Sequence, residues 1–335
     1  MPSIFWLIPL TSSSFPIEVV NSDTLESNLF RLARLTWSVP VSQGYGRRMR
    51  FLVWDDYHEK LMGIFALGDP VFNLKVRDEF IGWNLEDRKK RLVNVMDAYI
   101  LGALPPYNMI LGGKLIASLV RTRDVRALFS AKYSNARGII SDLTKKPSLV
   151  LVSTSSSLGR SSIYNRLKLD GVKYFQSLGF TSGWGHFHIP DSLFEDMRYY
   201  LKKKNHHYAT NHQFGDGPNW RLRTIRACLD MIGMNSDLLK HGICREVFIS
   251  RLAMNAERVL RGEVSRPCWR DLLSVEKVAE LAKDRWVVPR AKRRKEFRDW
   301  EAVKIRQLLN PSKNGSVSLI RGPKLITNRA SRKSI

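Results

Sequence analysis

An uninterrupted apolar run at residues 149–152 (Leu-Val-Leu-Val) constrains the fold of this chain more than any other feature. Two lysines and a proline precede the run, and a cluster of serines follows it. A short apolar run between such breakers is typical of a strand that is covered on both faces. The sequence therefore predicts a strand at residues 148–152 that lies inside a sheet.

Further strands and helices are predicted on both sides of this run. Residues 50–54 and 61–67 are expected to form an antiparallel hairpin, because turn residues follow each of them. Other strands are expected at residues 94–101, 174–181 and 184–189. Helices are expected at residues 22–37, 115–133, 191–204, 220–232, 243–260 and 274–284. This order predicts an α+β fold, in which helices flank a mixed β-sheet.

Composition divides the chain into four parts. Residues 1–204 are expected to form an α/β domain, and residues 205–219, rich in His, Gly and Asn, a loop or linker. Residues 220–310 are expected to form a basic helical region. Residues 311–335 carry six Lys or Arg and no acid, which predicts a disordered basic tail.

Charge gives the strongest indication of a partner. The 335 residues include 55 Lys or Arg and 31 Asp or Glu, so the formal net charge is +24. A polyanion relieves self-repulsion of this size, which makes nucleic acid the first expected partner and an anionic membrane surface the second. No stretch is apolar for long enough to cross a bilayer, so we expect nucleic acid, with DNA favoured over RNA, and no membrane.

Several segments are expected to contact the nucleic acid. Basic residues neutralise phosphates, and aromatic residues between them stack on unpaired bases. The serine-rich loop after residues 148–152 adds hydroxyl groups at the end of a strand, where α/β sheets bind ligands; the alternative is a solvated loop. The candidate residues are Arg47, Arg48, Trp83, Ser155, Arg160, Lys202, Lys203, Arg221, Arg223, Arg290, Arg293 and Arg294.

Cysteines and histidines give little indication of a metal or disulfide site. Cys228, Cys244 and Cys268 are far apart and form no CxxC pair, which predicts a reducing, cytoplasmic compartment. His186 and His188 would share one face of the strand expected at 184–189, but two histidines alone do not make a metal site. His206, His207 and His212 lie in a polar segment, and no metal is expected there either.

The order of elements resembles that of the GNAT acyltransferase fold. A helix precedes a hairpin and a third strand, then a glycine turn opens a helix, and the strand at 148–152 follows. Residues 174–180, in which Tyr174 precedes a Gly-Phe pair, are similar to the late helix-to-strand corner of that fold. The resemblance covers roughly residues 20–190 and implies a GNAT-like sheet with acyl-CoA as the candidate cofactor.

The glycine turn is where this resemblance would place acyl-CoA. GNAT enzymes offer backbone N–H groups at a helix N-terminus to the pyrophosphate of the cofactor. Asn108, Gly112, Gly113 and Lys114 occupy that stretch here, and of the signature positions only Gly113 coincides. The alternative is a tight turn that lets a helix pack closely on the sheet.

A closer resemblance covers about residues 47–120. Residues 50–54 (Arg-Phe-Leu-Val-Trp) are followed by Arg77-Asp78 and by Ile81-Gly82-Trp83. This pattern resembles the core signature of the Druantia anti-phage protein A (DruA-like) family. The resemblance implies a component of a multi-gene defence system, with other subunits of that system as partners, and assigns it no chemistry.

Three functions stay open at this point. The leading hypothesis is a nucleic-acid-binding subunit of an anti-phage defence system. A GNAT-type acyltransferase would instead modify a nucleic-acid base, with Asp78 or Tyr174 as the catalytic base. A mobile-element protein that only binds DNA is the third. The competing structural role of Asp78 is an ion pair with Arg77, and that of Trp83 is to fill the core.

Overall fold

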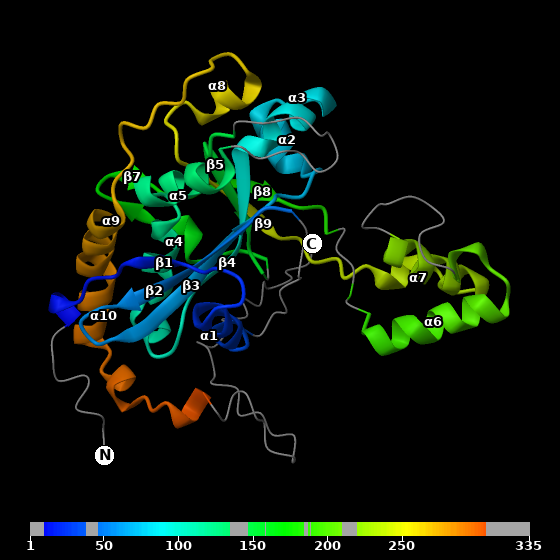
Figure 1. The fold of residues 1–335 in the computed structure, drawn as a ribbon, viewed down its shortest axis with the longest axis horizontal. Coiled ribbons are helices and arrows are strands. Elements are labelled where there is room, and N and C mark those ends of the chain that lie inside the picture. The colour runs from blue at the N-terminus through cyan, green and yellow to red at the C-terminus, as the bar shows by residue number, and fades with distance from the viewer. Residues whose placement is uncertain are drawn as a thin grey trace, which may run out of the picture.

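The computed structural model describes residues 10–37, 46–134, 147–157, 159–183, 187, 189–209 and 220–305. A mixed sheet of seven strands lies at its centre (Figure 1). In spatial order these strands are β1 (Ile17–Val19), β2 (Arg48–Asp55), β3 (Lys60–Gly68), β4 (Val95–Ala103), β5 (Leu151–Ser155), β9 (Glu246–Arg251) and β8 (Gln176–Phe180). A separate pair, β6 (Lys168–Leu169) and β7 (Val172–Lys173), is antiparallel.

The central pair β4 and β5 is parallel, whereas every other neighbouring pair of the described sheet is antiparallel. The parallel ladder joins only Val95–Asp97 to Leu151–Ser153. Beyond it β4 continues to Ala103 and β5 to Ser155 without pairing to each other. The carboxyl-terminal parts of β4 and β5 therefore separate from each other near the middle of the sheet.

Helices cover both faces of the sheet, and two further helices, α6 (Asp191–Lys203) and α7 (Trp220–Met231), pack against each other away from it. The others are α1 (Leu25–Arg34), α2 (Lys75–Ile81), α3 (Leu85–Arg91), α4 (Gly112–Leu119), α5 (Arg123–Tyr133), α8 (Ala256–Arg261), α9 (Val275–Ala282) and α10 (Val288–Arg293). Local sequence explains several starts: the hydroxyl of Thr24 accepts the Ser27 N–H, and Asn84 with Asp87 forms a capping box on α3.

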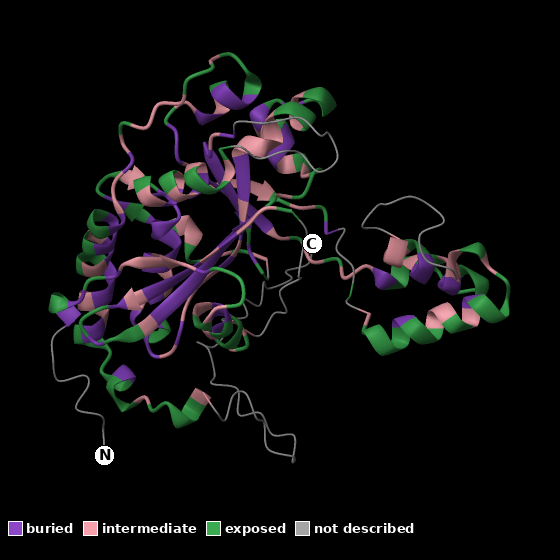
Figure 2. Cartoon of the chain, viewed as in Figure 1, coloured by how far each residue is buried: buried purple, intermediate pink, exposed green. Residues whose placement is uncertain are grey.

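The core has one cluster on one face of the sheet and two on the other. On one face, α4 and α9 bury Leu115 and Val278 with Phe51 and Phe65 of the hairpin. On the other, α1 buries Phe30 against β2–β4, and α2 with α8 covers β5 and β9. Figure 2 shows the central strands buried almost throughout. Alternate side chains of β2 thus enter different clusters, with Phe51 and Val53 on one face and Leu52 on the other.

A helical lobe leaves the sheet after β8 and returns to it at β9. We define this lobe by its described residues, 189–209 and 220–239. It projects from the rest of the molecule in Figure 1, and α6 packs against α7 through Phe194, Ile225 and Leu229. The lobe has a small apolar core of its own, and its charged side chains lie on the outer surface.

Most expected elements are present, including the hairpin β2–β3, the strands β4, β5 and β8, and the helices α1, α4–α7 and α9. The helix expected at 243–260 is wrong in its first half, which forms strand β9 before α8 begins at Ala256. Residues 247–249 are buried between β5 and β8, and a strand covered on both faces has the same apolar run as a buried helix.

Strand β9 also extends the sheet beyond residue 204, so the sheet is not confined to the expected domain 1–204. Most of the strand expected at 184–189 lies outside the described residues, as do residues 1–9 and 306–335. None of the helices in the described ranges combines the length and the hydropathy needed to span a membrane.

Candidate functional site

The glycine turn at the start of α4 has a packing role at Gly112. A Cβ atom there would lie 2.7 Å from the Tyr107 carbonyl oxygen and 3.0 Å from the Ala103 Cβ. Gly113 is less crowded, with the nearest atom, Ile163 Cδ1, 3.8 Å from a Cβ. The close approach of helix and strand explains Gly112 without a cofactor.

The rest of the turn retains some features of an anion site. Asn108 is exposed, and the Lys114 amine lies 5.3 Å from the ring centroid of Trp286. Burial lowers the pKa of Lys114, and the positive charges of Arg166 and Arg285 lower it further. Arg166 and Arg285 thus add positive charge in the region of Lys114, and acyl-CoA at this turn stays a prediction.

Asp78 is held in a buried ion-pair network. Its carboxylate accepts hydrogen bonds from Arg77 Nε at 2.9 Å, from Arg88 Nη1 at 2.7 Å and from the Leu74 N–H at 3.2 Å. The side chain of Arg77 is fully buried and also donates to two backbone carbonyls. Both oxygens of Asp78 are thus engaged, which supports the structural role and leaves the catalytic base without support.

Trp83 and Tyr174 are also interior residues. Trp83 is 8% exposed, and its Nε1–H donates to the Leu260 carbonyl at 2.6 Å, so its ring is not available to stack on a base. Tyr174 is 2% exposed and lies 5.2 Å from the guanidinium of Arg121. Burial raises the pKa of Tyr174, which opposes formation of the phenolate that a base would need.

A polar patch that the sequence analysis missed lies where β4 and β5 diverge. The Ser153 hydroxyl donates to the carboxylate of Asp97 at 2.9 Å, and the Thr154 hydroxyl donates to the Ala98 carbonyl at 2.7 Å. Burial of its carboxyl group raises the pKa of Asp97 to about 6, although Ser153 and the charges of Arg77 and Arg48 lower it. Asp97 as a whole residue is half-buried, and its carboxyl group lies on the buried side, where a near-neutral pKa marks it as a candidate acid–base group.

Arg48 completes this patch. Its guanidinium carbon lies 4.3 Å from the ring centroid of Tyr99, two residues along β4 from Asp97. The Nε atom of Arg48 is buried and has no hydrogen-bond partner among the described residues. An acid alone inside a largely apolar strand was the sequence signal that could have identified Asp97.

The serine-rich loop after β5 is fixed by a second missed acid, Glu246 on β9. Its carboxylate accepts hydrogen bonds from the Ser177 hydroxyl at 2.8 Å, the Ser161 N–H at 3.1 Å and the Asn165 amide at 3.0 Å. Burial opposes ionisation, but these hydrogen bonds outweigh it and lower the pKa of Glu246. The acid anchors the loop, and Ser155 and Arg160 lie on its exposed surface.

The predicted basic residues fall into three groups: those paired with acids, those partly buried and those exposed. Arg47 and Arg221 are engaged: Arg47 pairs with Asp69 at 2.7 Å, and Arg221 pairs with Asp191 at 2.7 Å while joining α7 to α6. Arg48, described above, and Arg290 are partly buried. The exposed group consists of Arg160, Lys202, Lys203, Arg223, Arg293 and Arg294, and of these Arg294 approaches Glu296 at 3.5 Å. His186, His188 and His212 lie outside the described residues.

Exposed cations gather both at residues 292–295 and on the helical lobe. Lys202, Lys203 and Lys204 end α6, and Arg223 and Arg226 lie on the exposed side of α7. Aromatic rings of His206, His207 and Tyr208 lie between the two helices in sequence. In the part of the chain that is described, no three His, Cys, Asp or Glu side chains are placed to hold a metal ion.

Comparison with known proteins shows that a single family model spans both the sheet and the helical lobe. The family model for Druantia protein DruA matches residues 11–262, a span that includes the sheet, the helical lobe and β9. A protein named Druantia protein DruA from Escherichia coli (strain UMEA 4076-1) is 56% identical over 286 residues, which cover 85% of this chain and 71% of that protein. No solved structure matches. The chain therefore belongs to the DruA family.

Proposed function

We propose that this chain is the nucleic-acid-binding component of an anti-phage defence system, the kind of system that membership of the DruA family implies. The observation that carries the proposal is the helical lobe, whose exposed surface presents three consecutive lysines and two arginines. With a net charge of +24 on the whole chain, such a surface gains free energy by releasing counterions from phosphates. DNA is the favoured polymer, and other subunits of the system are the expected protein partners.

Binding across a salt series tests this proposal. Protein stripped of nucleic acid is titrated into duplex DNA, single-stranded DNA and RNA between low and physiological salt. We expect the logarithm of affinity to fall linearly with the logarithm of salt concentration, with a slope of about −0.9 for each duplex phosphate contacted. Weak binding to all three polymers, or a slope near zero, would contradict the proposal.

A charge-matched pair of variants locates the contact. K202Q/K203Q removes two exposed lysines from α6, and K89Q/K90Q removes two exposed lysines from α3, on the other part of the molecule (Figure 1). Both variants lower the net charge equally. We expect the slope to fall in magnitude by about 2 only for K202Q/K203Q. Equal losses in both variants would show that net charge, and not the lobe, drives binding.

A lobe deletion separates binding from folding of the sheet. Phe180 and Glu246 are register partners in β8 and β9, and the Thr181 N–H donates to the Arg245 carbonyl at 2.9 Å. The two strands can therefore be joined by a tight turn that replaces residues 182–244. We expect the shortened chain to keep its sheet by circular dichroism, to lose most of its affinity for DNA and to lose phage protection in the full operon.

Acyl transfer to a nucleic-acid base is a second candidate function, and Asp97 is the observation that favours it. A carboxyl group with a pKa of about 6 can take the proton that an amine loses as its nitrogen bonds to the acyl carbon. Acyl-CoA would supply the acyl group: its carbon–sulfur bond would break as the nitrogen–carbon bond forms, and coenzyme A would leave as the thiol after taking up a proton. Mass spectrometry of nucleosides tests this function in three kinds of cell: with the wild-type gene, with the D97N gene and without the gene. We expect an acyl adduct in the wild-type cells and none in the other two. If no sample contains an adduct, the acyl-transfer function is rejected.

A further inference from the structure

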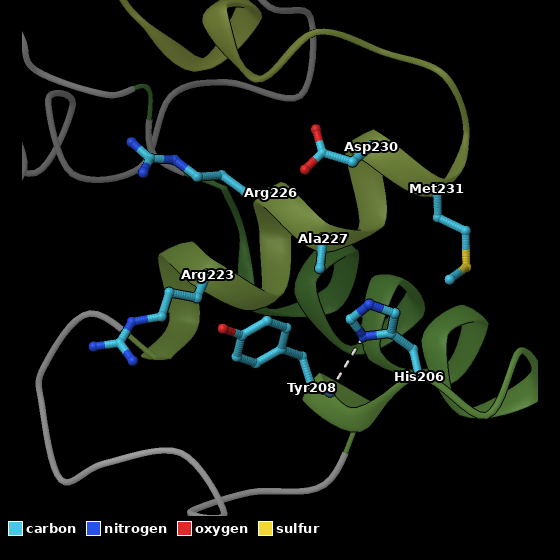
Figure 3. Close-up of a pocket in the computed structure, with 7 residues that line it drawn as sticks. All are labelled: His206, Tyr208, Arg223, Arg226, Ala227, Asp230 and Met231. Atoms are coloured by element: carbon cyan, nitrogen blue, oxygen red, sulfur yellow. Dashed lines mark hydrogen bonds between the residues drawn. The ribbon is translucent and has the colours of Figure 1, made fainter.

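A pocket of about 520 Å³ opens on the helical lobe, between residues 206–208 and α7 (Figure 3). This volume lies in the range of small-ligand sites, about 300–1,000 Å³. Two of its lining residues, Arg223 and Arg226, belong to the basic surface described above. The pocket walls are of two chemical kinds, aromatic on one side and charged on the other.

The aromatic wall comes from His206 and Tyr208. The planes of these two rings are inclined by 24°, with centroids 5.6 Å apart, and the ring of His207 lies 4.4 Å from each. Burial lowers the pKa of His206, and the neighbouring His207 lowers it further, which favours the uncharged form of the His206 ring. Adjacent, nearly parallel rings form a surface on which a planar base can stack.

The opposite wall is one face of α7. Arg223, Arg226 and Asp230 recur three and four residues apart, so their side chains project from the same side of the helix. Ala227 lies among them and leaves room in the pocket (Figure 3). All three charged residues are exposed at the rim. Guanidinium groups bind phosphate oxygens, and a carboxylate accepts hydrogen bonds from the N–H groups of a base.

We propose that this pocket takes one unpaired nucleotide of a single-stranded nucleic acid. The base stacks against Tyr208 and His206, its N–H groups donate to Asp230, and the flanking phosphates contact Arg223 and Arg226. A duplex cannot do this, because its bases are already stacked and paired. The inference rests on the proposed nucleic-acid binding and adds to it the class of substrate and the residues that select it.

The test compares a single strand with a duplex of the same sequence, using the full-length protein and fluorescence anisotropy. Y208A should weaken binding of the single strand by about 5- to 100-fold, the loss typical of one stacked base, and change duplex binding less than about twofold. Y208F keeps the ring and should bind like wild type. Y57A, which removes a tyrosine 46% exposed on the β2–β3 turn, is the matched control and should also bind like wild type.

An oligonucleotide with abasic sites gives a control on the ligand. It keeps the phosphates but offers no base, so wild-type protein should bind it about as weakly as Y208A binds the intact strand. If wild type prefers the single strand but Y208A binds it equally well, the pocket assignment is wrong and the proposed function stands. If wild type binds neither polymer, both fail. Tight binding of free mononucleotides in place of the strand would also overturn the assignment to a polymer.

Discussion

The buried ion pair of Arg77 and Asp78 allows a sharp test of whether Asp78 is structural. D78A removes the carboxylate that accepts from Arg77 Nε at 2.9 Å and from Arg88 Nη1 at 2.7 Å. The guanidinium of Arg77 is fully buried, and after the change it retains only the carbonyls of Val71 and Phe72, each at 3.0 Å. Burial already lowers the pKa of Arg77, and Asp78 is the main group that raises it.

The expected loss follows from the burial of this charge. Removing one partner of a buried pair and leaving the other in place lowers the free energy of unfolding by about 3–5 kcal/mol. R88A, whose side chain is 18% exposed, removes a more peripheral contact and should lower it by about 1 kcal/mol. R77M/D78A removes both buried charges, so it should be more stable than D78A alone.

Urea unfolding, followed by tryptophan fluorescence and circular dichroism, measures these differences. D78A should unfold at a clearly lower urea concentration than R88A, with no large change in slope. A D78A protein within about 0.5 kcal/mol of wild type would show that the pair is not buried as described. A D78A protein that is stable but fails to protect against phage would return Asp78 to the list of functional residues.

Three further changes test other parts of the structure. The pKa of Asp97 is raised from 3.8 to about 6, so its protonated form stabilises the fold below about pH 4, and about 3 kcal/mol of that stability is lost as the pH rises from about 4 to about 6. The melting temperature of D97N relative to wild type should therefore rise between about pH 3 and pH 7, and a constant difference would refute the burial. G112A should lower the free energy of unfolding by about 1–3 kcal/mol, because the new Cβ would lie 2.7 Å from a carbonyl oxygen. G113A should be tolerated, because the nearest atom is 3.8 Å away. If chemical denaturation shows equal losses for the two variants, the packing role of Gly112 is contradicted. W83F removes the donor to the Leu260 carbonyl and should destabilise the protein by about 1–3 kcal/mol while leaving DNA affinity unchanged; a selective loss of DNA affinity would restore the stacking role.

Local sequence patterns predicted the elements that depend on local interactions. The hairpin β2–β3, strand β5 and the capped helix α1 are each set by turn residues, an apolar run or a hydroxyl cap within a few residues. The sequence pattern of residues 246–251 predicts a helix, whereas these residues form strand β9, because the strand depends on pairing with β5 and β8, which lie far away in sequence. Pairing at such distance leaves no local signal beyond a short apolar run.

The candidate site was less predictable than the fold for a related reason. Asp97 and Glu246 become distinctive only when tertiary packing buries them and brings Ser153 or Ser177 to their oxygens. Conversely, Asp78 resembled a base until the structure paired it with two arginines. Arg47 and Arg221 are as basic as Lys202 in the sequence, and only the structure shows that acids engage them. Charge is visible in a sequence, but its availability to a ligand is not.

The position of β9 in the sheet has a consequence for synthesis of the protein. Strand β5 ends at Ser155, but its neighbour β9 begins only at Glu246, after the whole helical lobe. At a translation rate of about 5–20 residues per second, the ribosome needs roughly 5–20 seconds to deliver β9. Until β9 is made, β5 lacks its antiparallel neighbour, so a sheet formed from β1–β5 in that interval would expose an apolar edge at β5. We expect the yield of folded protein to depend on how well chaperones shield that edge, and to rise when expression is slowed by lowering the temperature.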